Sequence, residues 1–151
     1  MTQDNENPEE VSRQDYGYWL QMTTRWADND VYGHVNNAVY FNYIDSVVNQ
    51  FLIENKLLDI HQSAAIGLVV QSQCRFFYPL SYPGEVDCGL RVRHLGQTSV
   101  GYEVGIFPAG AQAVAAIGGF THVFVDRHQR QPCPIPEPVR HALQTLTPMM
   151  E

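Results

Sequence analysis

The residues best suited to chemistry lie close together in one stretch, Arg25 to Asp45, which reads RWADNDVYGHVNNAVYFNYID. It holds three carboxylates, a histidine and a glycine around the start of a predicted helix. A helix N-terminus exposes unpaired amides and the positive end of the helix dipole, which stabilise the oxyanion formed when a carbonyl is attacked. A carboxylate a few residues upstream can make that attack or activate water for it. The stretch therefore favours chemistry at a carbonyl group.

Two elements must position this stretch. Residues 36–55 place apolar side chains at three- and four-residue steps with polar ones between them, which predicts a long amphipathic helix. Asn36 is the expected N-cap, because its side chain can accept from first-turn amides. Residues 18–26 are rich in aromatic residues and threonine and predict a strand that ends at the turn-forming cluster of Asp28, Asn29, Asp30 and Gly33.

After the helix the period changes from about 3.6 to two. Alternation predicts four more strands, the first of them half-buried, with a bulge or bend at Gly118-Gly119; the strands cover residues 68–78, 86–92, 100–106 and 113–125. A short helix follows from Pro138 to Thr145. Hairpin-length connections make the sheet antiparallel, and the one long helix must cover its apolar face. The predicted class is α+β, with a twisted sheet of about five strands curled around a central helix.

The segment DNDVYGHVNNAVYFNYID resembles the signature of 4-hydroxybenzoyl-CoA thioesterase-type hotdog proteins. The resemblance rests on a D-x-D, a following glycine, and aromatic and acidic helix positions. The order of elements and the late run THVFVD…PCPIPE also match, so that the resemblance covers roughly residues 18 to 140. It implies a hotdog fold and an acyl-CoA thioesterase that hydrolyses the substrate to a free acid and coenzyme A, with no metal or cofactor.

The resemblance also implies roles for individual residues. The second aspartate of the D-x-D, Asp30, takes the position of the nucleophile or general base, and Asp28 becomes structural. An amide in the first helical turn donates to the oxyanion, and ungapped placement puts it at Asn37; the expected oxyanion region comprises Gly33, Val35, Asn36 and Asn37. Without the resemblance, Asp28 and Asp30 could equally be turn formers, and His34 is expected to pack or cap.

Other assignments concern the substrate. Tyr40 and Asp45 are candidates for the acyl pocket, although a solvated or cross-dimer role for Asp45 is an equal alternative. Many relatives carry glutamate at this position and a basic residue one turn later, where this chain has Asn49. The phosphates of coenzyme A need cations, for which the candidates are Arg91, Arg93, Arg127 and Arg130. The acyl group, a protein-borne pantetheine as carrier, and dimer against tetramer all stay open.

Composition narrows the class of protein. With 151 residues and a net charge of −7, the chain is expected to form one domain over residues 16–151, after a disordered acidic tail at residues 1–15. The charge disfavours nucleic acid, and neither a secretory signal nor a membrane segment is present, which predicts a cytoplasmic protein. Three cysteines without paired spacing fit a reduced compartment, and a homodimer or homotetramer is expected.

Two other functions fit the same fold. A hotdog hydratase or dehydratase would use a histidine with a carboxylate, and Gly33-His34 is similar to such a site, but Val35-Asn36-Asn37 follows where those enzymes have G-H-F and prolines. A non-catalytic acyl-CoA-binding module would keep the fold without the chemistry. The presence of Asp30 favours the thioesterase over both.

Overall fold

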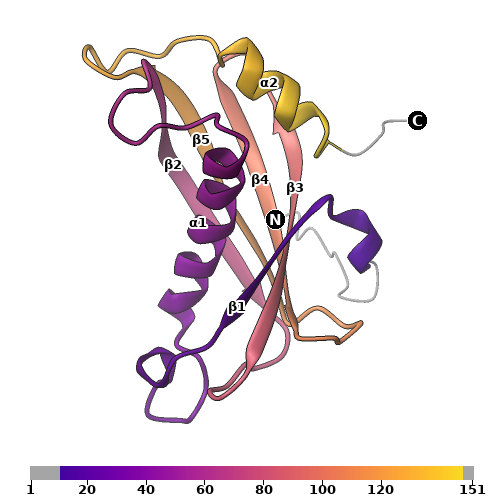
Figure 1. The fold of residues 1–151 in the computed structure, drawn as a ribbon. Coiled ribbons are helices and arrows are strands. Elements are labelled where there is room, and N and C mark those ends of the chain that lie inside the picture. The colour runs from indigo at the N-terminus through magenta and orange to yellow at the C-terminus, as the bar shows by residue number, and fades with distance from the viewer. Residues whose placement is uncertain (1–10, 148–151) are drawn as a thin grey trace, which may run out of the picture.

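The computed structural model describes residues 11–147, which form one five-stranded antiparallel sheet, a long helix and a short one (Figure 1). The sheet order is β1-β3-β4-β5-β2. The elements are β1 (Tyr18–Thr23), α1 (Asn37–Glu54), β2 (Ala65–Phe76), β3 (Glu85–Leu95), β4 (Ser99–Pro108), β5 (Ala116–Asp126) and α2 (Glu137–Gln144). The predicted strand, long helix and four strands are confirmed, as is the closing short helix. None of the helices within residues 11–147 is both long and apolar enough to span a membrane.

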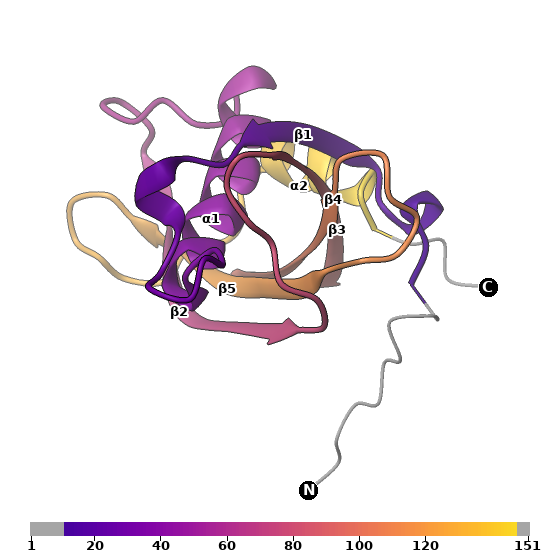
Figure 2. The ribbon, with the colours of Figure 1, turned by 90° about the horizontal axis from the view of Figure 1, so that it is seen from below.

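The sheet curls around α1, with β1 and β2 as its two edges (Figure 2). The apolar stripe of α1, which includes Ile44, Val47 and Val48, is buried against the sheet, and each such side chain contributes about 2 kcal/mol on burial. Gly118 on β5 permits the close approach, because a Cβ there would lie 2.5 Å from Cδ1 of Ile44. This is the hotdog arrangement, and the fold prediction is confirmed.

The outer face of the sheet is covered in part by the N-terminal segment. Tyr16 packs there with Phe107 in a second apolar cluster, and the Arg13 guanidinium bonds to Asp87 at 2.9 Å. The sequence analysis placed residues 1–15 in a disordered tail. Residues 11–15 instead pack on the sheet because Val11 and Arg13 find apolar and acidic partners across the fold, and residues 1–10 lie outside the described part of the chain.

The alternation predicted for β2 is not observed. The strand lies at the edge of the sheet, and its pairing with β5 shifts register between Val69 and Gln71. Leu68 and Val70, expected on a buried face, are 36% and 61% exposed, since the shift moves the first part of the strand to the opposite phase. At Gly118-Gly119 the ladder runs without a register shift, so no bulge occurs there.

Candidate active site

The connection between β1 and α1 is organised around Asp28. The strand stops at Thr23, earlier than predicted, and Trp26–Asp28 forms a short 3-10 turn. The Asp28 carboxylate is buried and accepts from the Arg25 backbone amide and guanidinium and from the Tyr43 hydroxyl, at 2.8 to 3.1 Å. Burial alone would raise the pKa of Asp28, but these hydrogen bonds outweigh it and hold the pKa below its usual range. Asp28 is structural in this geometry, since it ties the loop to α1.

Asp30 lies half-buried in the tight turn that follows. Its Oδ1 accepts from the amides of Tyr32 at 2.8 Å and His34 at 3.3 Å, and its own amide donates to the His34 carbonyl at 2.7 Å. Gly33 has a φ of +82°, which glycine adopts without strain. One carboxylate oxygen thus acts as a turn former, while Oδ2 has no hydrogen-bond partner within residues 11–147. His34 contributes its backbone to the turn, and its side chain is exposed.

The opening turn of α1 leaves one amide unpaired. Asn36 caps the helix as predicted, because its Oδ1 accepts from the Ala38 amide at 2.9 Å. The amides of the other expected donors are already bonded: Gly33 to the Asp30 carbonyl, Val35 to that of Leu80, and Asn36 to that of Asp28. Within the described chain only the Asn37 amide of this group lacks a partner. Asn37 is the position that the family resemblance assigned to the oxyanion donor.

The two expected pocket residues lie in different surroundings. Tyr40 is buried in the core, packs edge-to-face on Phe76 at 4.9 Å, and has a pKa raised by burial. Asp45 lies on the exposed face of α1, where Asn49 donates to its Oδ1 at 2.9 Å. A neutral amide therefore occupies the place of the basic residue found in many relatives.

A polar groove that the sequence did not reveal runs along α1 beside Asp28. Its volume is about 470 Å³, and it is lined by Met22, Thr23, Arg25, Asp28, Asn42, Tyr43, Asp45 and Ser46. Asp30 is not among these residues, so the groove lies beside the turn that holds Asp30. The polar positions 42, 45 and 46 of the helix were the available signal, but nothing local showed that the end of β1 would face them.

The four arginines expected to bind phosphate do not gather at this end of α1. Arg91 is buried and pairs with Glu103 at 2.6 Å, and Arg93 lies 3.9 Å from the same carboxylate. The guanidinium of Arg127 donates to carbonyls of the segment after α1, including Ile60 at 2.9 Å. Arg130 is exposed in the turn after β5. Arg127 and Arg130 thus lie toward the C-terminal end of α1, remote from Asp30 in the same chain (Figure 1).

The chain was compared with known proteins. The model of the thioesterase-like superfamily matches residues 24–143. The PA5185 protein of Pseudomonas aeruginosa is 45% identical, superposes with a TM-score of 0.87, and the match covers 90% of this chain and 95% of that one. A 1,4-dihydroxy-2-naphthoyl-CoA thioesterase of Synechocystis (18% identity, TM-score 0.77, coverage 84% and 95%) and a thioesterase superfamily protein of Jannaschia sp. CCS1 (22%, 0.77, 85% and 81%) share the fold. No curated protein matches the sequence.

The curled antiparallel sheet around α1 defines a hotdog protein. The family match extends over most of the chain, from the end of β1 into α2. The chain belongs to the thioesterase-like superfamily.

Proposed function

We propose that the protein hydrolyses the thioester bond of an acyl-CoA at the N-terminal end of α1. The observation that carries this proposal is the unpaired Asn37 amide, which lies at the start of α1 just after the turn that holds the half-exposed Asp30 carboxylate. A bare amide at a helix start is an oxyanion donor, because it adds a directed hydrogen bond to the positive end of the helix dipole. The free Oδ2 of Asp30 supplies the base or nucleophile.

In the proposed reaction the thioester carbonyl oxygen accepts from the Asn37 amide. Asp30 either takes a proton from an attacking water or attacks the carbonyl carbon itself, giving an anhydride that water then opens. In both routes the C–S bond breaks and the sulfur leaves as a thiolate, which takes up a proton from the solvent, while the proton lost by the water passes to the solvent by way of Asp30 or directly. A thiol with a pKa of about 8.5 leaves without a dedicated acid. A single turnover in ¹⁸O-labelled water tests for the anhydride: direct attack by water labels the acid and never Asp30, whereas an anhydride opened at the Asp30 carboxyl carbon releases an unlabelled acid and leaves the label in Asp30, which mass spectrometry of the protein detects.

The polar groove beside Asp28 is the proposed site of the pantetheine arm. This arm carries two amides, and Thr23, Asn42 and Ser46 supply neutral donors and acceptors along the groove wall. Arg25 adds a cation, with its side chain 71% exposed. The similar Synechocystis protein acts on an aromatic acyl-CoA, and we propose the same carrier here without assigning the acyl group.

A homodimer would add cations from one protomer to the Asp30 end of the other. Within residues 11–147 no strand pairs with the outer edge of β2, which exposes Leu68, Val69 and Val70, and such an edge is a template for strand pairing. An isologous contact joins two β2 strands antiparallel and brings the Arg127–Arg130 turn of one protomer toward the Asp30 end of the other. Val70→Lys should convert a dimer to a monomer in light scattering and raise KM for acyl-CoA, whereas Ile53→Lys on the exposed face of α1 should change neither.

Turnover of a panel of acyl-CoA thioesters, followed with a thiol-trapping dye, tests the proposed activity. Asp30→Asn keeps an Oδ1 that can accept from the Tyr32 and His34 amides, so that the turn should persist while kcat falls by at least about a hundredfold. Asp59→Asn is the matched control, since Asp59 is an exposed carboxylate whose Oδ1 also accepts from two turn amides, those of His61 and Gln62, and it should retain activity. Binding of acyl-CoA without thiol release would instead establish a non-catalytic module, and a hydrated product with its thioester intact would establish a hydratase.

A further inference from the structure

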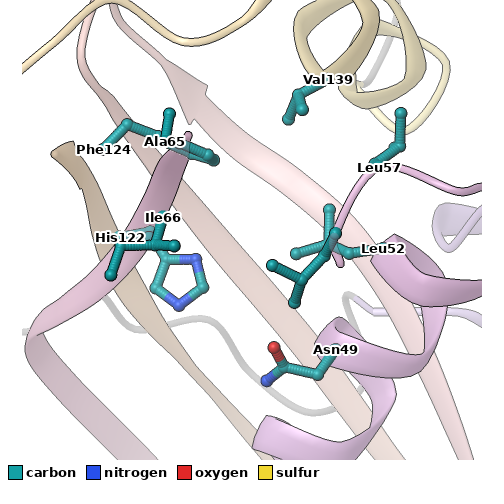
Figure 3. A pocket seen from close by; sticks show the side chains of 10 residues that line it. Asn49, Leu52, Leu57, Ala65, Ile66, His122, Phe124 and Val139 are labelled. Carbon is teal, nitrogen blue, oxygen red and sulfur yellow. The ribbon is translucent and has the colours of Figure 1, made fainter. Parts of the chain in front are cut away.

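A cavity of about 60 Å³ lies at the C-terminal end of α1, between that helix, the β2–β5 edge of the sheet and α2 (Figure 3). Most of the side chains in its wall are apolar, among them those of Leu52, Leu57, Leu58, Ile66, Phe124 and Val139. Of the α1 residues in the cavity wall, Asn49 is the nearest to Asn37. At a rise of about 1.5 Å per helical residue, the two lie roughly 18 Å apart along the helix axis. The cavity is therefore separate from the candidate active site of the same chain.

One polar side chain in the cavity wall is left unsatisfied. His122 is 5% exposed, and its Nδ1 has no hydrogen-bond partner within residues 11–147. Its ring is held by Tyr102 at 5.4 Å and Phe120 at 4.6 Å. Gly67 makes room for it, because a Cβ there would lie 2.6 Å from Nδ1. Burial lowers the pKa of His122 to about 4, so the imidazole is neutral near pH 7.

Asn49 faces His122 across the cavity (Figure 3). Its Nδ2 donates to two oxygens of Asp45, each at 2.9 Å, which leaves its Oδ1 as an acceptor at the wall. The cavity thus presents an imidazole and an amide oxygen within an otherwise apolar lining. An unbonded buried polar group is costly, and a group that bonded to His122 would offset that cost.

We infer that this cavity is a second binding site, which takes the end of a small aliphatic molecule that carries a hydroxyl group. A hydroxyl can both donate and accept, so it can bond to either tautomer of a neutral imidazole, and where it accepts from Nδ1–H its one proton is left to donate to Asn49. The volume of about 60 Å³ exceeds the roughly 10–15 Å³ that one water requires, so the cavity has room for a group larger than a single water. A hydroxyl joined to a short aliphatic chain matches both parts of the lining.

Two isomers of the same composition test the inference on the full chain. 1-Butanol carries a hydroxyl, while methyl propyl ether has the same atoms in a linear molecule without a donor. NMR titration should show saturable shifts of the His122 ring protons, with 1-butanol binding about threefold to tenfold more tightly than the ether. In His122→Phe, which keeps an aromatic ring and removes the polar atoms, the preference for 1-butanol should shrink, because only Asn49 remains to bond to the hydroxyl.

Two results would overturn the inference. One is equal affinity of the isomers for the wild-type protein, and the other is a shift that grows linearly without saturation, which would leave the cavity to water only. Both comparisons use wild-type protein and hold even if His122→Phe fails to fold. Neither depends on turnover, so a failed binding test and a failed test of thioester hydrolysis are distinguishable.

Discussion

The two ends of α1 differ in how their polar groups are satisfied. At the N-terminal end, Asp28 accepts hydrogen bonds from Arg25 and Tyr43, and among the amides of Gly33, Val35, Asn36 and Asn37 only that of Asn37 has no partner within the described residues. At the C-terminal end, apolar side chains enclose a cavity in which Nδ1 of His122 has no partner among the described residues. The N-terminal end is a hydrogen-bonded network beside an unpaired amide, and the C-terminal end is a cavity in which His122 and Asn49 lie among apolar side chains.

The difference indicates where each end can do chemistry. An unpaired amide within a hydrogen-bonded, solvent-facing network is preorganised as a donor, because the neighbouring groups are already bonded to others and cannot accept from it. A buried polar group among apolar side chains favours ligands that can hydrogen-bond to it. The free-energy cost of its desolvation arises on folding and is not added when the ligand binds. Catalysis therefore suits the first end and binding selectivity the second.

The largest expected effect follows from removing the centre of the N-terminal network. Asp28→Ala leaves the buried Tyr43 hydroxyl and the Arg25 amide without their acceptor, and we expect the free energy of unfolding to fall by about 3 kcal/mol in urea titrations. Because hydrogen bonding lowers the pKa of Asp28, its contribution is present at neutral pH and is lost as the pH falls through the folded-state pKa.

Asp45→Ala is the control for that experiment. Asp45 is an exposed carboxylate on α1 that bonds to the neutral Asn49, so its removal should change the free energy of unfolding by less than about 0.5 kcal/mol. Equal losses in the two variants would show that the network around Asp28 does not hold this end together.

A smaller effect is expected at the other end of the helix and depends on pH. The pKa of His122 falls from 6.5 to about 4 on folding. The unfolded chain therefore binds more protons between these values, and the free energy of unfolding drops as the pH is lowered through them. Between pH 7 and pH 5 the wild type should lose about 2 kcal/mol more than His122→Phe. Parallel pH dependence in the two proteins would contradict the buried, neutral state of His122.

Local patterns predicted the N-terminal end well. The helix, its Asn36 cap and the turn around Gly33 are encoded within a few residues of one another, and short-range signals determine them. The prediction that the Asn37 amide is the oxyanion donor came from the family resemblance and stays a prediction; the structure shows that the amides of Gly33, Val35 and Asn36 are bonded to other groups.

Features that depend on strand register could not be predicted. A regular ladder extended from the turn between β3 and β4 would pair Arg91 with Val104. The register shifts between Val92 and His94, however, and Arg91 pairs with Glu103. The resulting ion pair buries an arginine that the sequence had suggested for phosphate. A similar shift at Val69 exposes part of β2. For His122 a signal was present, since it alternates with Phe120 and Phe124 on the face of β5 that meets α1.

The smallest effect compares two asparagines at the two helix ends. Asn36 accepts from the Ala38 amide, and Asn55 donates to the Phe51 carbonyl at 2.7 Å. Each alanine variant should lose about 1 kcal/mol in the free energy of unfolding. Only Asn36→Ala should also reduce kcat/KM for acyl-CoA, by several-fold, because the Asn36 turn orients the adjacent Asn37 amide and a small misplacement of a donor slows the reaction. If both variants slowed turnover alike, the effect would reflect the helix as a whole, and the N-terminal end would have no special part in the reaction.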